Sequence, residues 1–127
     1  MNAKRKLRIE CDKLFKEVIL FEAAGRCEVC GSSFGTTAHH FIPRSLAGHL
    51  IHYLPNGVCL CQSCHFSHHT KDDPAIDRAI IQKRGNKWFL GLMERRKEKH
   101  YSYQTLGYYQ ETKMNLQNNI DKLNQDE

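Results

Sequence analysis

The sequence predicts an α+β fold, in which two short strands and one helix form a small core flanked by longer helices. Three observations indicate it: an amphipathic helical pattern at each end of the chain, two short apolar runs near its middle, and two Cys-x-x-Cys pairs around those runs. The chain has 127 residues, a length that suits a single domain. We expect an N-terminal amphipathic helix in residues 1–25, the core in 26–72 and a helical extension in 73–127.

The first helix is predicted over residues 4–24, because apolar side chains recur there at steps of three and four, with Lys and Glu between them. Gly25 is placed to end it. In the core, we expect one strand over 38–42 and a second over 58–60, after the turn-forming sequence Pro-Asn-Gly. A helix is expected to begin near His65, directly after the second cysteine pair.

Three further helices are expected beyond the core. Asp73 and Pro74 suit a helix start, because Asp caps the first amides and Pro fits the first turn. This helix is predicted to end at Gly85, and a short helix around Trp88 follows it. The last helix, beyond Tyr103, has heptad-like apolar spacing. Two alternatives are open for it: packing back on the first helix, or forming a homodimer.

The charge balance is mildly basic, with 19 Lys and Arg against 14 Asp and Glu. A basic excess favours a polyanionic partner such as nucleic acid. No apolar run is long enough to cross a bilayer, and no signal-peptide pattern follows the basic N-terminus. We therefore expect a cytoplasmic protein with no membrane partner.

The chain has six cysteines, and four of them form the two Cys-x-x-Cys pairs. In a reducing compartment, such pairs are metal ligands more often than disulfides, and four thiolates make a closed, structural zinc site. The predicted zinc ligands are Cys27, Cys30, Cys61 and Cys64. Cys11 and Cys59 lie outside the pairs and are expected to be small buried residues. A redox protein that uses the paired thiols is an open alternative.

Histidines near the cysteine pairs predict a second, catalytic metal site. His39 and His40 are adjacent in the predicted strand, so their side chains point to opposite faces. His65 and His69 are four apart on a helix and share a face. We therefore predict that His39, His65 and His69 bind a divalent ion that keeps open coordination positions. His68 is an alternative to His69, because a three-residue step serves nearly as well.

His40 is the predicted general base, because a neutral imidazole is available near pH 7 to take a proton from water. A buried histidine that donates to a carbonyl is the alternative. Asn56 cannot titrate, and we expect it to hydrogen-bond the backbone across the loop and to orient His40. Arg44 is a candidate phosphate ligand, with a surface salt bridge as the alternative. The histidines expected to be solvated or to lie behind the site are His49, His52 and His100.

In this order, the residues resemble the HNH endonucleases, which have a ββα-metal, treble-clef-like fold. The resemblance covers about residues 20–70. The sequence "AHHFIPRS…NGVCLCQSCH" within it is similar to phage and prophage members, including NinG-like recombination nucleases. The resemblance implies a metal-dependent endonuclease that hydrolyses DNA phosphodiester bonds in a bacterial or phage-infected cell. Low sequence specificity is expected, and structured or branched DNA is a candidate substrate.

The resemblance is incomplete at the first predicted ligand of the catalytic ion, because many relatives carry Asp where this chain has His39. Imidazole suits Zn²⁺, Ni²⁺, Co²⁺ or Mn²⁺ better than Mg²⁺, which prefers oxygen ligands. The catalytic ion is therefore open among these five. The alternative function is a zinc-containing module that binds nucleic acid without cutting it, and such a module has no use for His40.

Overall fold

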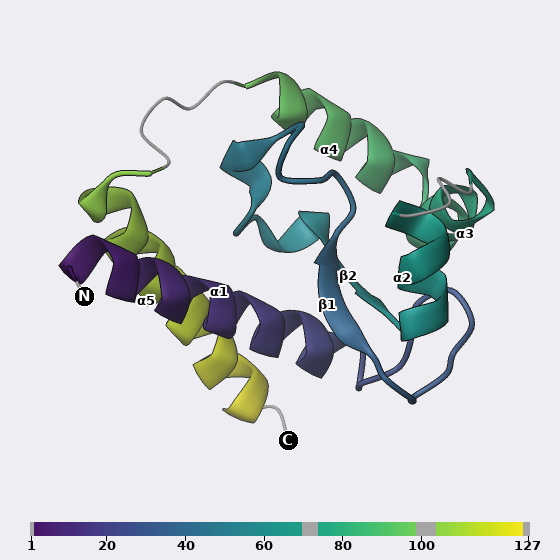
Figure 1. The fold of residues 1–127 in the computed structure, drawn as a ribbon, viewed down its shortest axis with the longest axis horizontal. Helices are drawn as coiled ribbons and strands as arrows, with labels where there is room; N and C mark the ends of the chain where they lie inside the picture. The colour runs from purple at the N-terminus through teal and green to yellow at the C-terminus, as the bar shows by residue number, and fades with distance from the viewer. Residues whose placement is uncertain (1, 70–73, 99–103, 126–127) are drawn as a thin grey trace.

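The computed structural model describes residues 2–69, 74–98 and 104–125. The elements follow in the order α1 (Ala3–Glu22), β1 (Thr37–His40), β2 (Gly57–Leu60), α2 (Gln62–His69), α3 (Pro74–Arg84), α4 (Asn86–Lys97) and α5 (Leu106–Gln125) (Figure 1). Two short 3-10 helices, η1 (Gly48–Leu50) and η2 (Leu54–Asn56), lie between the strands. The predicted α+β fold is confirmed. Within the described ranges, none of the helices combines the length and the apolar character needed to cross a bilayer.

Helix α1 begins and ends where its local sequence predicts. The side-chain oxygen of Asn2 accepts a hydrogen bond from the amide of Arg5 (2.8 Å), which caps the first turn. At the other end, Gly25 adopts a φ of 70° and donates to the carbonyl of Leu20 (2.9 Å). Ala24 before it is also left-handed, with a φ of 53°, and donates to the carbonyl of Phe21 (3.0 Å). Glycine adopts this conformation without the steric cost of a Cβ, so Gly25 suits the second position of this turn.

The two strands are antiparallel, with Ala38 opposite Cys59 and His39 opposite Val58. Alternate side chains enter two separate cores. Val58 and Leu60 pack with residues of α3 and α4, whereas Ala38 and Cys59 pack with residues of α1 and α5. Helices therefore cover both faces of the sheet, and Figure 1 shows the strands between α1 and α4.

Strand β1 ends at His40, two residues earlier than predicted, because a side chain replaces the partner strand. Oδ1 of Asn56 accepts from the amide of Ile42 (2.8 Å), and its Nδ2 donates to the carbonyls of Ile42 (3.2 Å) and Leu50 (3.3 Å). Asn56 is completely buried, so these bonds are shielded from water. The expectation that Asn56 binds the backbone across the loop is confirmed.

Helix α2 begins at Gln62, three residues earlier than the predicted start near His65. The reason is that the second cysteine pair is itself the helix start: the amide of His65 donates to the carbonyl of Cys61 (2.9 Å). Cys64 therefore lies in the first turn of α2, one turn from Cys61, where both sulfurs can face the same side.

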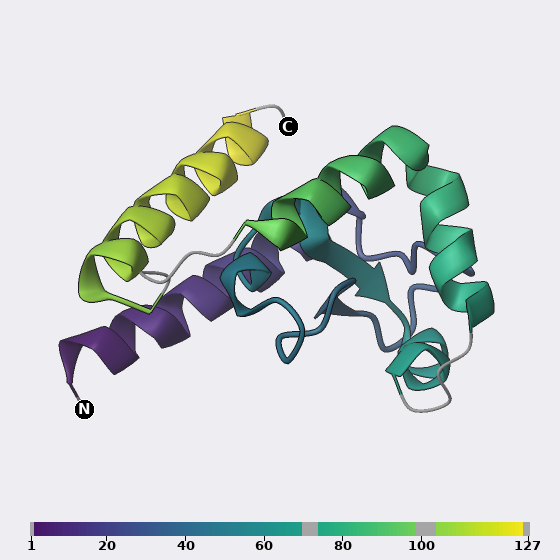
Figure 2. The same cartoon turned by 90° about the horizontal axis from the view of Figure 1, so that it is seen from above.

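The C-terminal helices follow the predicted order. Helix α3 begins at Pro74 and ends before Gly85, whose φ of 96° marks the turn into α4. The predicted cap, Asp73, lies outside the described residues. Helix α5 lies along α1 (Figure 2) and buries Tyr109 and Leu116. Packing of the last helix on the first is therefore confirmed, whereas the homodimer stays a prediction.

Gly57 marks the closest approach of β2 to α1. A Cβ on Gly57 would overlap the side chain of Ile19 and lie 2.9 Å from Cζ of Phe15. We expect Gly57→Ala to lower the free energy of unfolding by about 1–3 kcal/mol, because α1 must move away from the strand. Denaturant unfolding measures this change.

Gly91 provides the matched control. It lies inside α4, and nothing is within 4 Å of the position its Cβ would take. Gly91→Ala should be neutral or stabilise the protein by up to about 1 kcal/mol, because alanine favours the helix. Equal losses in the two variants would contradict a special close approach at Gly57.

Candidate metal centre and histidine site

The four cysteines of the two pairs converge on one point. The sulfurs of Cys27, Cys30, Cys61 and Cys64 all lie within 4.8 Å of one another. The Sγ atoms of Cys30 and Cys61 are 3.6 Å apart. A tetrahedron of Zn–S bonds of about 2.3 Å places its sulfurs about 3.8 Å apart, so spacing and donor type both fit a structural zinc.

The turns around these cysteines point amides at the sulfurs. The amide of Val29 donates to Sγ of Cys27 (3.4 Å), and the amide of Cys64 donates to Sγ of Cys61 (3.5 Å). Burial opposes ionisation of Cys27, but backbone hydrogen bonds outweigh it and lower its pKa to about 6. The surroundings of Cys27 thus favour the thiolate, the form that zinc binds, whereas burial and the neighbouring thiols raise the pKa of Cys64. Convergence of all four sulfurs favours a metal over the redox alternative, in which each pair acts by itself.

We expect Cys30→Ser to reduce bound zinc well below one ion per chain and to lower the thermal midpoint, because one of four thiolates is lost. Metal analysis and thermal unfolding measure the two effects. Cys11→Ser is the matched control: Cys11 is buried in the other core, and its Sγ donates to the carbonyl of Tyr109 (3.3 Å), a bond that serine can also make. Full zinc content in Cys30→Ser would contradict the four-thiolate site.

Glu28, inside the first cysteine pair, connects this centre to α3. Its Oε2 accepts from the amide of Cys59 (2.8 Å), and its two oxygens receive the guanidinium of Arg84 at 2.7 and 2.8 Å. Arg84 also donates to the carbonyls of Pro55 (3.1 Å) and Gly57 (2.8 Å). One bidentate ion pair therefore joins the zinc-binding turn, the start of β2 and the helical extension. No local spacing in the sequence predicts it, because its members come from distant segments.

The Glu28–Arg84 pair is largely shielded, with side chains 11 % and 21 % exposed. We expect Arg84→Met to lower the free energy of unfolding of the zinc-loaded protein by about 2–4 kcal/mol, because Glu28 keeps a charge with no cation beside it. Lys97→Met is the control, since its pair with Glu94 is largely exposed and contributes little. A similar stability for both variants would show that the α3 connection is unimportant.

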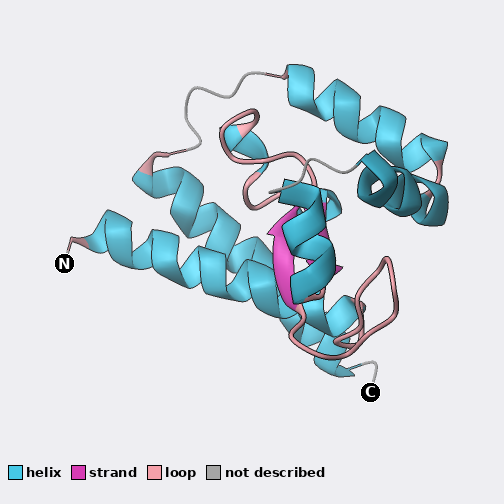
Figure 3. Cartoon of the chain, turned by 45° about the vertical axis from the view of Figure 1, so that its right-hand side comes forward, coloured by secondary structure: helices cyan, strands magenta, loops and turns pink. Residues whose placement is uncertain are grey.

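His39 and His65 come together from β1 and α2, as the sequence predicts, and Figure 3 shows α2 next to the strands. Their ring centroids are 3.6 Å apart and their planes differ by 12°, so the rings are stacked. Because an imidazole binds a metal in the plane of its ring, both rings must turn before they share one ion. The side chain of His69 lies outside the described part of the structure. The ligand roles of these three histidines stay predictions.

His68, the alternative to His69, has a carboxylate partner on another helix. Its Nε2 pairs with Oδ1 of Asp77 in α3, and its ring lies 6.1 Å from that of Phe41. These contacts connect α2 to α3. Apart from the four cysteines, the described residues contain no group of three or more His, Cys, Asp or Glu whose ligand atoms converge.

His40 faces α1, on the opposite side of the strand from His39. Its ring stacks on Phe15, with centroids 5.3 Å apart, and its Nε2 lies 2.8 Å from the carbonyl oxygen of Ile51. A carbonyl only accepts, so Nε2 carries the proton, and a neutral ring keeps Nδ1 as an acceptor. Burial lowers the pKa of His40 and so favours this neutral form. The alternative for His40, a buried histidine that donates to a carbonyl, fits the contact with Ile51. It does not exclude the role of a base, because Nδ1 is still an acceptor.

Asn56 and Arg44, the other two predicted site residues on this side, lie near the loop and the ring of His40, and their roles stay predictions. Asn56 binds Leu50, the residue before the carbonyl that His40 contacts, and so helps to hold that loop. Arg44 is exposed, and its positive charge adds to the effect of burial in lowering the pKa of His40. The guanidinium of Arg44 therefore lies near the His40 imidazole.

His52 is buried rather than solvated, with 7 % of its surface exposed. Its Nε2 lies 2.7 Å from Oδ1 of Asp12, and its Nδ1 lies 3.1 Å from the hydroxyl of Tyr108. These partners belong to α1 and α5, and the sequence gives no signal for them because the contacts exist only once the helices pack. His49 lies 3.0 Å from the carbonyl of Arg95, and His100 lies outside the described residues.

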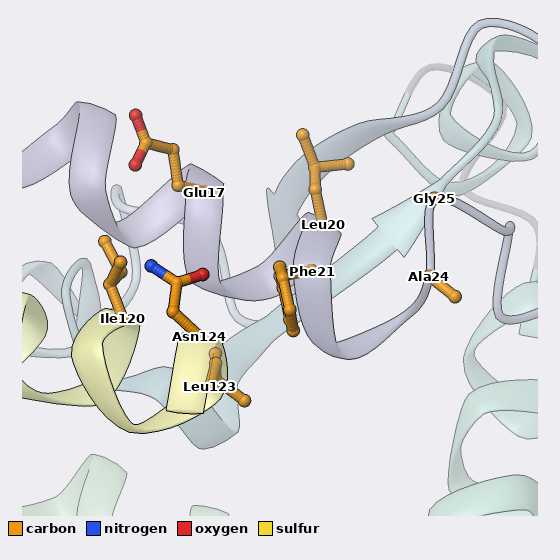
Figure 4. A pocket seen from close by; sticks show the side chains of 8 residues that line it. All are labelled: Glu17, Leu20, Phe21, Ala24, Gly25, Ile120, Leu123 and Asn124. Carbon is orange, nitrogen blue, oxygen red and sulfur yellow. The ribbon is translucent and has the colours of Figure 1, made fainter. Parts of the chain in front are cut away.

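An open groove of about 810 Å³ runs between the C-terminal ends of α1 and α5 (Figure 4). Its apolar lining includes Leu20, Phe21, Ile120 and Leu123. No cysteine or histidine of the candidate site lines it, so this groove is separate from the predicted chemistry.

The ββα core combines a cysteine cluster that fits a zinc ion with paired histidines on β1 and α2. Comparison with protein families agrees: residues 27–71 match the family model described as HNH endonuclease. The match begins at the first zinc-site cysteine and includes both strands and α2. The resemblance is confirmed over this segment, and it supports a nuclease or nucleic-acid-binding function in general. No match was found among curated proteins or among solved structures.

Proposed function

We propose that this protein is a metal-dependent DNA endonuclease of the HNH type, with His40 as its general base. The observation that carries the proposal is the bond between Nε2 of His40 and the carbonyl of Ile51 (2.8 Å). This bond directs the proton to Nε2 and leaves Nδ1 to accept a proton from an attacking water. The HNH match supports DNA as the substrate.

The other predicted residues have roles around that base. Asn56 holds the loop that carries the Ile51 carbonyl. Arg44, exposed near His40, would donate to two oxygens of a phosphate. His39 and His65 are adjacent imidazole donors, and with His69 they would hold a divalent ion after their rings turn.

When bound, such an ion would offset charge on the reacting phosphoryl group and stabilise the leaving oxygen. Its imidazole ligands favour Zn²⁺, Ni²⁺, Co²⁺ or Mn²⁺ over Mg²⁺. In-line attack by the water that His40 deprotonates would produce 5′-phosphate and 3′-hydroxyl ends.

Low sequence specificity is part of the proposal. Basic runs at residues 4–6, in the first turns of α1, and at 95–97, at the end of α4, offer contacts to phosphates of any sequence. Contacts of this kind set affinity rather than base preference. Structured or branched DNA is therefore as suitable a substrate as a linear duplex.

We expect His40→Ala to reduce cleavage by a factor of about 10²–10⁴, because no group remains to take the proton. The measurement is cleavage of plasmid, linear and branched DNA with each of Mn²⁺, Ni²⁺, Co²⁺, Zn²⁺ and Mg²⁺. DNA affinity and zinc content should stay close to wild type. His49→Ala is the control, because His49 contacts α4 and not the predicted base.

Two results would contradict the proposal. Cleavage that survives in His40→Ala would show that His40 is not the base. Wild-type protein that binds DNA but cuts none of these substrates with any of the five ions would instead support a non-catalytic nucleic-acid-binding module.

A further inference from the structure

We infer that His52 is a positioning residue for His40: held by Asp12 and Tyr108, it directs the Ile51 carbonyl that receives the His40 proton. The inference rests on the proposed function, in which His40 is the base. It also gives the flanking helices a role in the site, because α1 and α5 lie outside the segment that matches the HNH family.

The His52 ring is held at both nitrogens. Nε2 lies 2.7 Å from the carboxylate of Asp12, and Nδ1 lies 3.1 Å from the hydroxyl of Tyr108. Burial raises the pKa of Tyr108 to about 12, so its phenol keeps its proton and can donate to Nδ1 or accept from it. A carboxylate oxygen accepts, so Nε2 donates to Asp12. The His52 side chain is only 1 % exposed, so these contacts leave the ring little freedom to rotate.

The peptide bond transmits this restraint to His40. The carbonyl of Ile51 and the amide of His52 belong to one rigid plane, so a restraint on the position of His52 limits how far that carbonyl can turn. Ile51 is itself buried, with 4 % of its surface exposed, which limits movement on the other side. The carbonyl oxygen lies 2.8 Å from Nε2 of His40.

Phe15 of α1 packs against both histidines. Its ring stacks on His40 at 5.3 Å and meets His52 edge-on at 6.3 Å. A displaced His52 would therefore disturb His40 through the carbonyl and through this shared aromatic neighbour. With the carbonyl misdirected, part of the His40 population would carry its proton on Nδ1 and be unable to act as a base.

The experiment removes each restraint on His52 in the zinc-loaded full chain. Tyr108→Phe removes the hydroxyl and keeps the ring, whereas Asp12→Ala removes the carboxylate. Glu10→Ala is the matched control, because the ion pair between Glu10 and Lys113 (2.7 Å) also joins α1 to α5 but does not involve His52. Asp12→Asn is the conservative variant, because its amide oxygen can still accept from Nε2.

Two quantities are measured: the cleavage kinetics on plasmid DNA, and the ¹⁵N–¹H spectrum of the His40 ring, which reports the protonated nitrogen. We expect kcat to fall about tenfold in Asp12→Ala and in Tyr108→Phe, with KM within about twofold of wild type. Both variants should show a larger share of the Nδ1-protonated form. Asp12→Asn should recover most of the rate, and Glu10→Ala should match wild type.

The inference is overturned if Asp12→Ala lowers kcat no more than Glu10→Ala does, or if the His40 spectrum is the same in all variants. The spectrum separates this outcome from failure of the proposed function. In a protein that cuts no DNA, a His40 tautomer change in Asp12→Ala but not in Glu10→Ala still supports the positioning role, and its absence refutes it.

Discussion

The convergence of four cysteine sulfurs determines where the rest of the candidate site lies. Two sulfurs come from the turn after α1, and two come from the junction between β2 and α2. A zinc ion among them would hold that junction against the turn after α1, and a core of this modest size would gain stability from it. Because β1 pairs with β2, the same restraint places His39 beside His65.

The two strands place the predicted metal ligands and the predicted base on opposite faces of the sheet. Successive residues of a strand point in opposite directions, so His39 faces α2 and His40 faces α1. His39 and His65 thus lie with the half of the core that holds the four cysteines, whereas the predicted base lies with α1 and α5. Polar contacts tie both halves to the segment between the strands and to the helices around it. Asn56 is buried and binds the loop backbone, Arg84 binds Glu28, and His52 contacts Asp12 and Tyr108.

Much of this arrangement follows from local sequence. Gly25 and Gly85 lie at helix ends with a positive φ, which glycine adopts readily, and the cysteine spacing alone predicts the cluster. Asn56 was predicted to bind the loop backbone and does so. The early end of β1 could not be predicted, because it depends on a buried side chain that replaces a strand partner. The burial of His52 could not be predicted either, because its partners belong to the two terminal helices.

The sequence by itself determined the chemical groups of this protein: four cysteines whose spacing suits one zinc, adjacent imidazoles on a strand, and an asparagine that cannot titrate. These groups depend on residue type and on short spacing along the chain. In a strand or a helix, that spacing fixes the side to which each side chain points. Tertiary structure alone decided which nitrogen of His40 carries a proton and which helices restrain the loop beside it. Those properties depend on contacts between segments far apart in the chain, and such contacts exist only after the two cores have packed.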